Sequence, residues 1–176
     1  MDPQPSYVVT PLTGFSPNIG RLVRMMSYTR WTTVRAVAGL SVSQLDHLHD
    51  AASNSIGALL AHIAAVEIAY QRSTFGTGFA SARDAEIDAA LELGDRARQE
   101  VRGSPLEHYL KLLDGVRRHT LGELATRTDP WLDETTALRS GKPASNYFKW
   151  FHVFEDELNH RGQIRWLRRR LPGASD

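Results

Sequence analysis

The chain has 176 residues, of which 41% are hydrophobic, and its formal net charge at pH 7 is +1. This length is typical of one domain with a full core, and the nearly balanced charge argues against a dedicated nucleic-acid-binding protein. The chain contains no cysteine, which excludes disulfides, zinc ribbons, cysteine nucleophiles and iron–sulfur clusters, so a metal would have to be held by histidine, carboxylate, carbonyl or water.

Residues 1–17 are rich in proline, and we expect them to form a lead ahead of the folded domain. They contain no basic region followed by an apolar stretch, so they do not resemble a signal peptide. No apolar run approaches the roughly 20 residues that span a bilayer. We therefore expect a soluble, cytoplasmic protein with a single domain at residues 18–172 and a short tail at residues 173–176.

Two long helices are predicted in the first half of the chain. Apolar residues follow helical spacing over residues 19–37. A polar segment at residues 41–50, in which Ser43 is the expected N-cap of a short helix, leads to a second long pattern over residues 53–70. Both long patterns have an apolar stripe on one side, as expected of helices that cover a core.

Two further long helices are predicted in the second half. Residues 84–102 indicate a modest helix at the periphery, and Pro105 marks the start of a third long helix over residues 106–124. A loop at residues 129–143 precedes the fourth long helix, which extends over residues 144–171. No segment has the period-two alternation of a strand. The prediction is therefore an all-α protein, a four-helix bundle with a short peripheral helix.

The fourth helix carries apolar residues on two opposite sides, at about 100° per residue. A helix that is apolar on both sides must be covered twice. We assign the side with His160 to the bundle interior and the opposite, aromatic side to a partner subunit, which predicts a homodimer through this helix. The interior side carries Val153, His160, Ile164, Leu167 and Leu171, and the aromatic side carries Tyr147, Phe151, Phe154 and Leu158.

Two carboxylates lie close to His160 on the same helix. Asp156 is four residues before it and Glu157 is three residues before it, and side chains at these spacings are neighbours on a helix. A lone histidine on an apolar face is more often a neutral, hydrogen-bonded core residue. A buried carboxylate beside an apolar stripe, however, is costly unless a cation compensates its charge, which favours a metal site.

Two strings connect this site to a known family. The strings Ser55-Ile-Gly-Ala-Leu-Leu-Ala-His62 and Glu157-Leu-Asn-His160-Arg-Gly-Gln-Ile164 resemble, in content and in order, the DinB-like family of four-helix bundles. The resemblance implies one long connection, for which residues 76–103 are the candidate. It also implies a divalent metal near the bundle axis, with zinc, nickel, iron and manganese as candidates.

The chain departs from the family pattern at one position. The family has one histidine on the second helix, which His62 matches, and two on the last helix spaced as His-x-x-x-His, of which only His160 is present. Asp156 occupies the other position. Aspartate is a competent ligand for these metals, so a site made of His62, Asp156 and His160 is feasible. The departure could equally mark a branch in which metal binding is weakened or lost.

Other residues compete for roles near the metal. Glu157 is the alternative carboxylate ligand. His152 is eight residues from His160, or roughly 12 Å along the helix axis. This distance suits an acid–base or outer-sphere role rather than ligation of the same ion, and a surface position is equally open to His152. Tyr28, Trp31 and Trp150 are candidates for lining a substrate pocket, although ordinary core or interface positions are also open to them.

A di-iron site is a further possibility that the sequence does not favour. Glu157 and His160 form a Glu-x-x-His motif, but such sites need a second copy of the motif on another helix. The chain contains no second copy.

The resemblance implies a metal-dependent enzyme that acts on a small molecule. Members of the wider family include transferases and isomerases that use a low-molecular-weight thiol as cosubstrate, and the absence of cysteine is compatible with a nucleophile supplied in this way. A hydrolase that uses metal-bound hydroxide is the close variant. The alternative to an enzyme is a non-catalytic, dimeric protein of the stress response that binds a metal or a small ligand.

Overall fold

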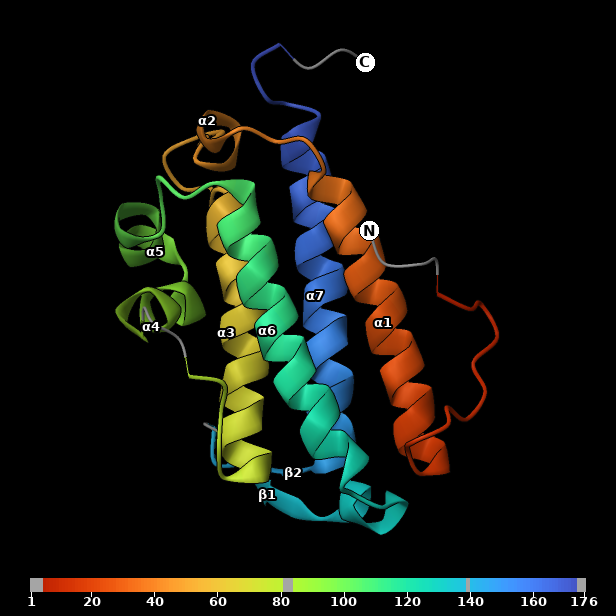
Figure 1. The fold of residues 1–176 in the computed structure, drawn as a ribbon. Coiled ribbons are helices and arrows are strands. Elements are labelled where there is room, and N and C mark those ends of the chain that lie inside the picture. The colour runs from red at the N-terminus through yellow and green to blue at the C-terminus, as the bar shows by residue number, and fades with distance from the viewer. Residues whose placement is uncertain (1–4, 81–83, 139, 174–176) are drawn as a thin grey trace.

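The computed structural model describes residues 5–80, 84–138 and 140–173. Its four long helices are α1 (Pro17–Val37), α3 (Ile56–Phe75), α6 (Leu106–Ala125) and α7 (Asn146–Arg168). The shorter elements are α2 (Val42–Leu45), α4 (Asp84–Glu92), α5 (Gly94–Glu100), the 3-10 helix η1 (Asp129–Asp133), β1 (Thr135–Ala137) and β2 (Pro143–Ser145). The four long helices stand side by side as a bundle (Figure 1), which confirms the predicted all-α fold.

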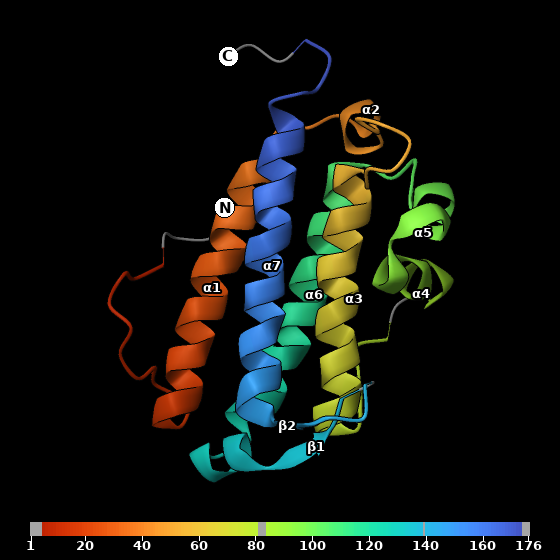
Figure 2. The same cartoon turned by 180° about the vertical axis from the view of Figure 1, so that it is seen from behind.

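The direction of the helices explains the long connection. Figure 1 shows that α1 and α7 run in one direction while α3 and α6 run in the other. Because α3 and α6 are parallel, the segment between them must return along the length of the bundle, and it does so through α4 and α5 on the outer side of α3 (Figures 1 and 2). Within the described part of the chain, every helix is too short or too polar to cross a membrane.

The connecting segment is more closely integrated than the sequence predicted. It forms two helices instead of one, because the helix is interrupted at Leu93 and Gly94, whose φ angles are 54° and 67°. α4 packs along α3, and Ile87, Ala89 and Ala90 are buried. The peripheral helix of the prediction is therefore a pair of helices that belongs to the core.

Helix starts are capped by short polar side chains. Ser55 Oγ accepts a hydrogen bond from the backbone N–H of Ala58 at the start of α3. The short helix α2 is capped by Ser41, which forms a capping box with Gln44, so the prediction of Ser43 as the N-cap was wrong. A cap satisfies backbone N–H groups that have no partner inside the helix.

The absence of strands was also a wrong prediction. β1 and β2 form an antiparallel pair in which Thr136 lies opposite Ala144. Each strand has three residues, which is too short for a period-two pattern to be recognised in the sequence. The hairpin closes the end of the bundle where α7 begins (Figure 2).

A buried group of four charges connects the four long helices. Arg30 on α1 and Arg117 on α6 both pair with Glu67 on α3 and Glu157 on α7, at N–O distances of 2.8–3.4 Å. Both carboxylates are fully buried. Because each charge has two partners of opposite sign, the group is neutral as a whole, as a buried set of ions must be to remain tolerable. We call these residues the charge quartet.

One side of α7 is buried, whereas the aromatic side contains both buried and exposed residues. The predicted interior positions Val153, His160, Ile164, Leu167 and Leu171 are all buried. On the aromatic side, Phe154 is only 6% exposed and contributes to the core, whereas Phe151 is 43% exposed. The sequence did not separate these two because both lie on the same side of an isolated helix.

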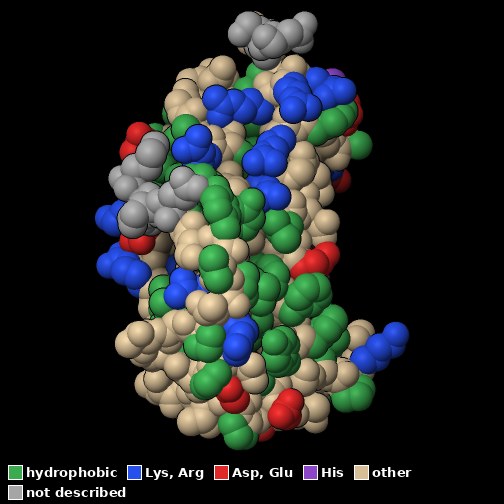
Figure 3. Space-filling view, turned by 90° about the vertical axis from the view of Figure 1, so that its right-hand side faces the viewer, with side chains coloured by type: hydrophobic (Ala, Val, Ile, Leu, Met, Phe, Trp, Pro, Cys, Tyr) green, Lys and Arg blue, Asp and Glu red, His purple; other side chains and the backbone are tan. Residues whose placement is uncertain are grey.

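Hydrophobic side chains also gather on the face that carries α1 and the N-terminal segment (Figure 3). A groove of about 350 Å³ lies there between that segment, α1 and α7, and its lining includes Tyr7, Val9, Tyr28 and Phe154. The segment that precedes α1 thus covers part of the helix surface.

Candidate metal centre

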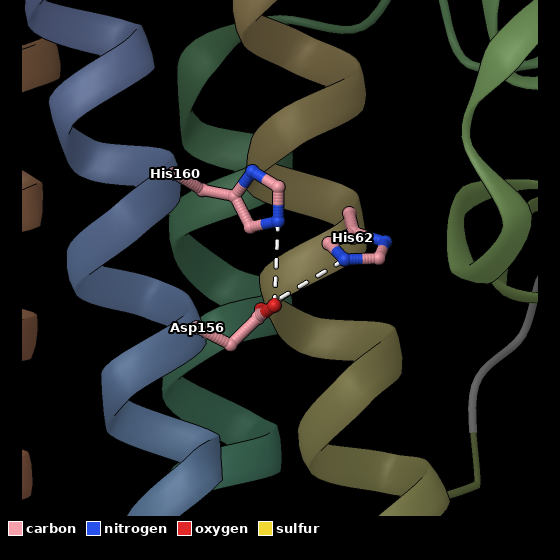
Figure 4. Close-up of side chains that lie close together, drawn as sticks. All are labelled: His62, Asp156 and His160. Atoms are coloured by element: carbon pink, nitrogen blue, oxygen red, sulfur yellow. Dashed lines mark ion pairs between the residues drawn. The ribbon is translucent and has the colours of Figure 1, made fainter.

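Three side chains from two helices converge beside the bundle axis. His62 comes from α3, and Asp156 and His160 lie one turn apart on α7 (Figure 4). Asp156 Oδ2 is 3.8 Å from His62 Nε2, and Asp156 Oδ1 is 3.4 Å from His160 Nε2. The two imidazole rings meet edge to face with 4.6 Å between their centroids. One ligand atom of each residue lies within 4.8 Å of the other two.

The orientation of His62 is fixed by the connecting segment. Its Nδ1 atom lies 2.8 Å from the backbone carbonyl oxygen of Ala90 on α4. A carbonyl oxygen only accepts hydrogen bonds, so Nδ1 carries the proton in this contact. In the neutral ring the lone pair is then on Nε2, the nitrogen that faces Asp156. A backbone carbonyl that holds the other ring nitrogen is the usual partner of a metal-bound histidine.

Asp156 lies in a partly buried position where its negative charge needs a counter-charge. Burial raises the pKa of Asp156, but the interactions of its carboxylate with the imidazoles of His160 and His62 outweigh this and lower the pKa well below its usual range. The carboxylate is therefore ionised at neutral pH. An ionised carboxylate that faces the lone pair of a neutral imidazole is repelled by it unless a proton or a metal ion lies between them.

A second observation also agrees with a divalent metal at this cluster. Asp156 Oδ2 and His160 Nδ1 are buried polar atoms that have no hydrogen-bond partner among the described residues, and such atoms normally have one. Two imidazoles and one carboxylate form a donor set that suits zinc, nickel, iron or manganese. The donor set and the unpartnered carboxylate oxygen agree with a cation site at this place.

Glu157 does not belong to this cluster. Its two carboxylate oxygens bond to Arg30 at 2.9 and 3.1 Å, and one of them lies 3.4 Å from Arg117. A residue next to Asp156 points about 100° away from it around the helix, and this direction leads into the charge quartet. The sequence offered Glu157 as the alternative carboxylate ligand, and the structure instead places it in the core with the two arginines.

The three aromatic candidates for the pocket lie elsewhere. Trp150 is fully buried and stacks on Phe75 at 5.0 Å between ring centroids. Tyr28 is 39% exposed and lines the groove under the N-terminal segment, and Trp31 is covered by the guanidinium of Arg35 at 4.9 Å. None of the three lines the cavity beside the cluster of His62, Asp156 and His160. They occupy ordinary core or surface positions instead.

A cavity of about 380 Å³ opens beside His62 and Asp156, and we call it the His62 pocket. His152 lines this pocket, so the structure places this candidate next to the cluster. Its Nδ1 lies 2.9 Å from Glu155 Oε2. The remaining wall comes from α3, α4, the β1 hairpin and α7, with Val66, Ala69, Tyr70, Ser73, Leu91, Ala137, Leu138 and Lys149.

Sequence reasoning missed Tyr70 and Lys149 as pocket residues. Tyr70 belongs to the apolar stripe of α3, and its ring lies edge to face with His152 at 5.8 Å. Burial and the charge of Asp156 raise the pKa of Tyr70, so its phenol remains protonated at neutral pH and is a hydrogen-bond donor. The spacing of eight residues between His62 and Tyr70 was a usable signal, since it places both on one side of α3.

Comparison with known proteins gives a family and a fold. A family model described as Mycothiol-S-transferase matches residues 21–173. A crystal structure described as a conserved protein from Enterococcus faecalis is similar to the chain with a TM-score of 0.69 and 14% identity, over 84% of this chain and 93% of that one. At that identity the likeness shows the fold alone. No curated protein matches the chain.

Proposed function

Because the chain belongs to the mycothiol-S-transferase family of DinB-like proteins, we propose that it transfers the sulfur of a small thiol to an electrophilic small molecule at a divalent metal held by His62, Asp156 and His160. The family indicates a thiol S-transferase type of activity. The metal and the assignment of its ligands are our proposal.

One observation carries the metal assignment. The backbone carbonyl of Ala90 holds Nδ1 of His62, which leaves the lone pair of Nε2 facing the ionised Asp156. His160 approaches the same carboxylate from the next turn of α7. A divalent cation is the simplest group that favours all three side chains in these positions.

When bound, a divalent cation supplies positive charge that lowers the pKa of a coordinated thiol. The chain itself has no cysteine, so the reacting thiol must be a cosubstrate. The His62 pocket adjoins two of the proposed ligands and has apolar walls, which suits it to receive the electrophile. The pocket therefore brings the second reactant next to the first.

The reaction requires a proton acceptor and a bond exchange. The thiol loses its proton, its sulfur forms a bond to the electrophilic carbon, and the leaving group departs with the electron pair of the broken bond. We assign the role of proton acceptor to His152, which lines the pocket and whose Nδ1 is held by Glu155. The phenol of Tyr70 lines the pocket as a hydrogen-bond donor and favours a polar or negatively charged part of the substrate there.

The experiment that tests this function is metal removal and return. Protein prepared without a metal-chelating tag is analysed for its elements and assayed for S-alkylation of mycothiol, before and after dialysis against a chelator. We expect a near-stoichiometric divalent metal, activity that disappears with it, and recovery when the metal is restored. Tight metal binding without turnover would instead support a binding protein, and activity that survives complete metal removal would refute the proposed site.

We also propose that α7 forms a homodimer through exposed aromatic residues of its first two turns. Phe148 and Phe151 are 45% and 43% exposed, and their rings are neighbours. Exposed aromatic pairs of this kind are typical of interfaces. Replacing both by serine is expected to shift the protein to the monomer position in size-exclusion chromatography with its helicity unchanged. The matched control is Trp166→Ser, at a 44% exposed aromatic on the same helix, and an unchanged elution of the double variant would contradict the dimer.

A further inference from the structure

Lys149 is a buried lysine in the His62 pocket that neither the fold nor the proposed reaction explains. The chain has three lysines, and Lys111 and Lys142 are exposed. Lys149 lies on α7, is only 1% exposed and lines the pocket together with His152 and Asp156. Its ammonium donates a hydrogen bond to the hydroxyl of Thr136 on β1. Among the residues that the structure describes, no carboxylate pairs with it.

In the part of the chain that is described, Lys149 lacks the counter-charges that the two arginines of the charge quartet have. Arg30 and Arg117 are each paired with two carboxylates in the charge quartet. Lys149 has one neutral hydroxyl as its partner, and burial lowers its pKa. A buried cation without a counter-charge is destabilising, and a methionine or leucine would fill the same place without this cost. The position therefore calls for an anion from outside the chain.

The pocket defines where that anion lies. Lys149 and Asp156 are seven residues apart and share one side of α7, so their Cα atoms are separated by about 10 Å along the axis. The wall of the same pocket also includes the apolar side chains of Val66, Ala69 and Leu91. A molecule that extends from Lys149 to the metal ligands thus has an anionic end, an apolar middle and a reactive end.

We propose that Lys149, with the Thr136 hydroxyl beside it, binds the carboxylate of the electrophilic substrate, so that the enzyme acts on aliphatic carboxylic acids whose electrophilic carbon is several bonds from the carboxylate. The anion-binding role of Lys149 stands on its burial, and the role of the anion as a reactant rests on the proposed transferase function. Lysine binds carboxylates through charge-assisted hydrogen bonds.

The binding test uses hexanoate and its neutral counterpart hexanamide as probes. Isothermal titration is performed on the metal-loaded wild type, on Lys149→Met and on the control Lys111→Met. We expect the wild type and the control to bind hexanoate about tenfold or more tightly than hexanamide, and Lys149→Met to lose this preference. Hexanoate binding that is unchanged in Lys149→Met would place the carboxylate on the metal or elsewhere and overturn the proposal.

Stability provides a readout that separates binding from damage to the fold. Methionine has a similar length and no charge, so we expect Lys149→Met to melt at or above the wild-type temperature. Lys149→Gln, which keeps a polar group, is the second variant and is expected to show the same loss of hexanoate preference. If both variants melt far below the wild type, Lys149 is a structural residue and the proposal fails.

A rate measurement distinguishes this inference from the proposed function. Mycothiol is alkylated with 6-bromohexanoate or 6-bromohexanamide, in which the sulfur displaces bromide. We expect the kcat/KM ratio of acid to amide to be about tenfold or higher in the wild type and to fall to near one in Lys149→Met. Turnover of both compounds with a ratio near one in the wild type would refute the inference and retain the transferase. Lys149-dependent hexanoate binding without any turnover would retain the anion site and refute the transferase.

Discussion

Asp156→Asn is expected to abolish stoichiometric metal binding and to reduce thiol S-transfer to the background rate. The substitution keeps the size of the side chain but removes the charge that lies between His62 and His160. Loss of a residue that only hydrogen-bonds to a metal ligand lowers metal affinity by roughly 10–100-fold. Asp156→Asn removes a proposed ligand itself, so we expect the affinity for the metal to fall by more than this. Elemental analysis and the mycothiol alkylation assay measure the two effects.

Two comparisons make this result specific. Asp114→Asn removes a carboxylate from the surface of α6, where Asp114 pairs with Arg118 in solvent, and is expected to leave metal content and rate unchanged. Asp156→His restores the His-x-x-x-His spacing of the DinB-like family on α7 and is expected to retain the metal. Retention of a full equivalent of metal by Asp156→Asn would show that the ion is held elsewhere.

His160→Ala completes the test from the other end of the α7 pair. The loss of this imidazole leaves one histidine and one carboxylate, too few ligands to hold a transition metal tightly. We expect the same loss of metal as in Asp156→Asn. The melting temperature of this variant shows whether the fold tolerates a smaller side chain at His160, which is only 9% exposed.

The long elements of the fold were predictable because they are periodic. The apolar patterns at residues 19–37 and 106–124 correspond closely to α1 and α6, since a long helix repeats its signal over several turns. β1 has three residues and no repeat. The break between α4 and α5 depends on a positive φ angle at Leu93, which a leucine rarely adopts.

The cluster could be inferred in part because its residues lie at informative spacings. Asp156 and His160 are one turn apart, and this alone places them together. Choosing between Asp156 and Glu157 required knowledge of what faces each of them, and Glu157 meets two arginines from α1 and α6. These contacts span 127 and 40 residues of chain and leave no local pattern. Lys149 was missed for the same reason, because its burial depends on the β1 hairpin.

The charge quartet is the feature for which we expect the largest change in stability. Arg117→Met is expected to lower the free energy of unfolding by about 3–5 kcal/mol, because it leaves Glu67 and Glu157 with Arg30 as their only cation in a buried place. The neighbouring Arg118 pairs with Asp114 at the surface and its side chain is 72% exposed. Arg118→Met is the matched control and should change urea unfolding by no more than the error of the measurement. Equal losses in both variants would show that the quartet contributes no more than a surface pair.

The pH dependence of this difference follows from Glu67. Burial raises the pKa of Glu67, but Arg117 and Arg30 outweigh it and hold the pKa below its usual value. A carboxylate whose pKa is lowered by folding stabilises the protein above the pKa of the unfolded chain, about 4.3 for glutamate, and this contribution is lost as the pH falls through the lower folded value. The stability gap between the wild type and Arg117→Met should therefore be constant from pH 6 to 8 and narrow below about pH 4. A gap that stayed constant into acid would mean that Glu67 is already protonated in the folded protein, and the quartet would then not be a set of paired ions.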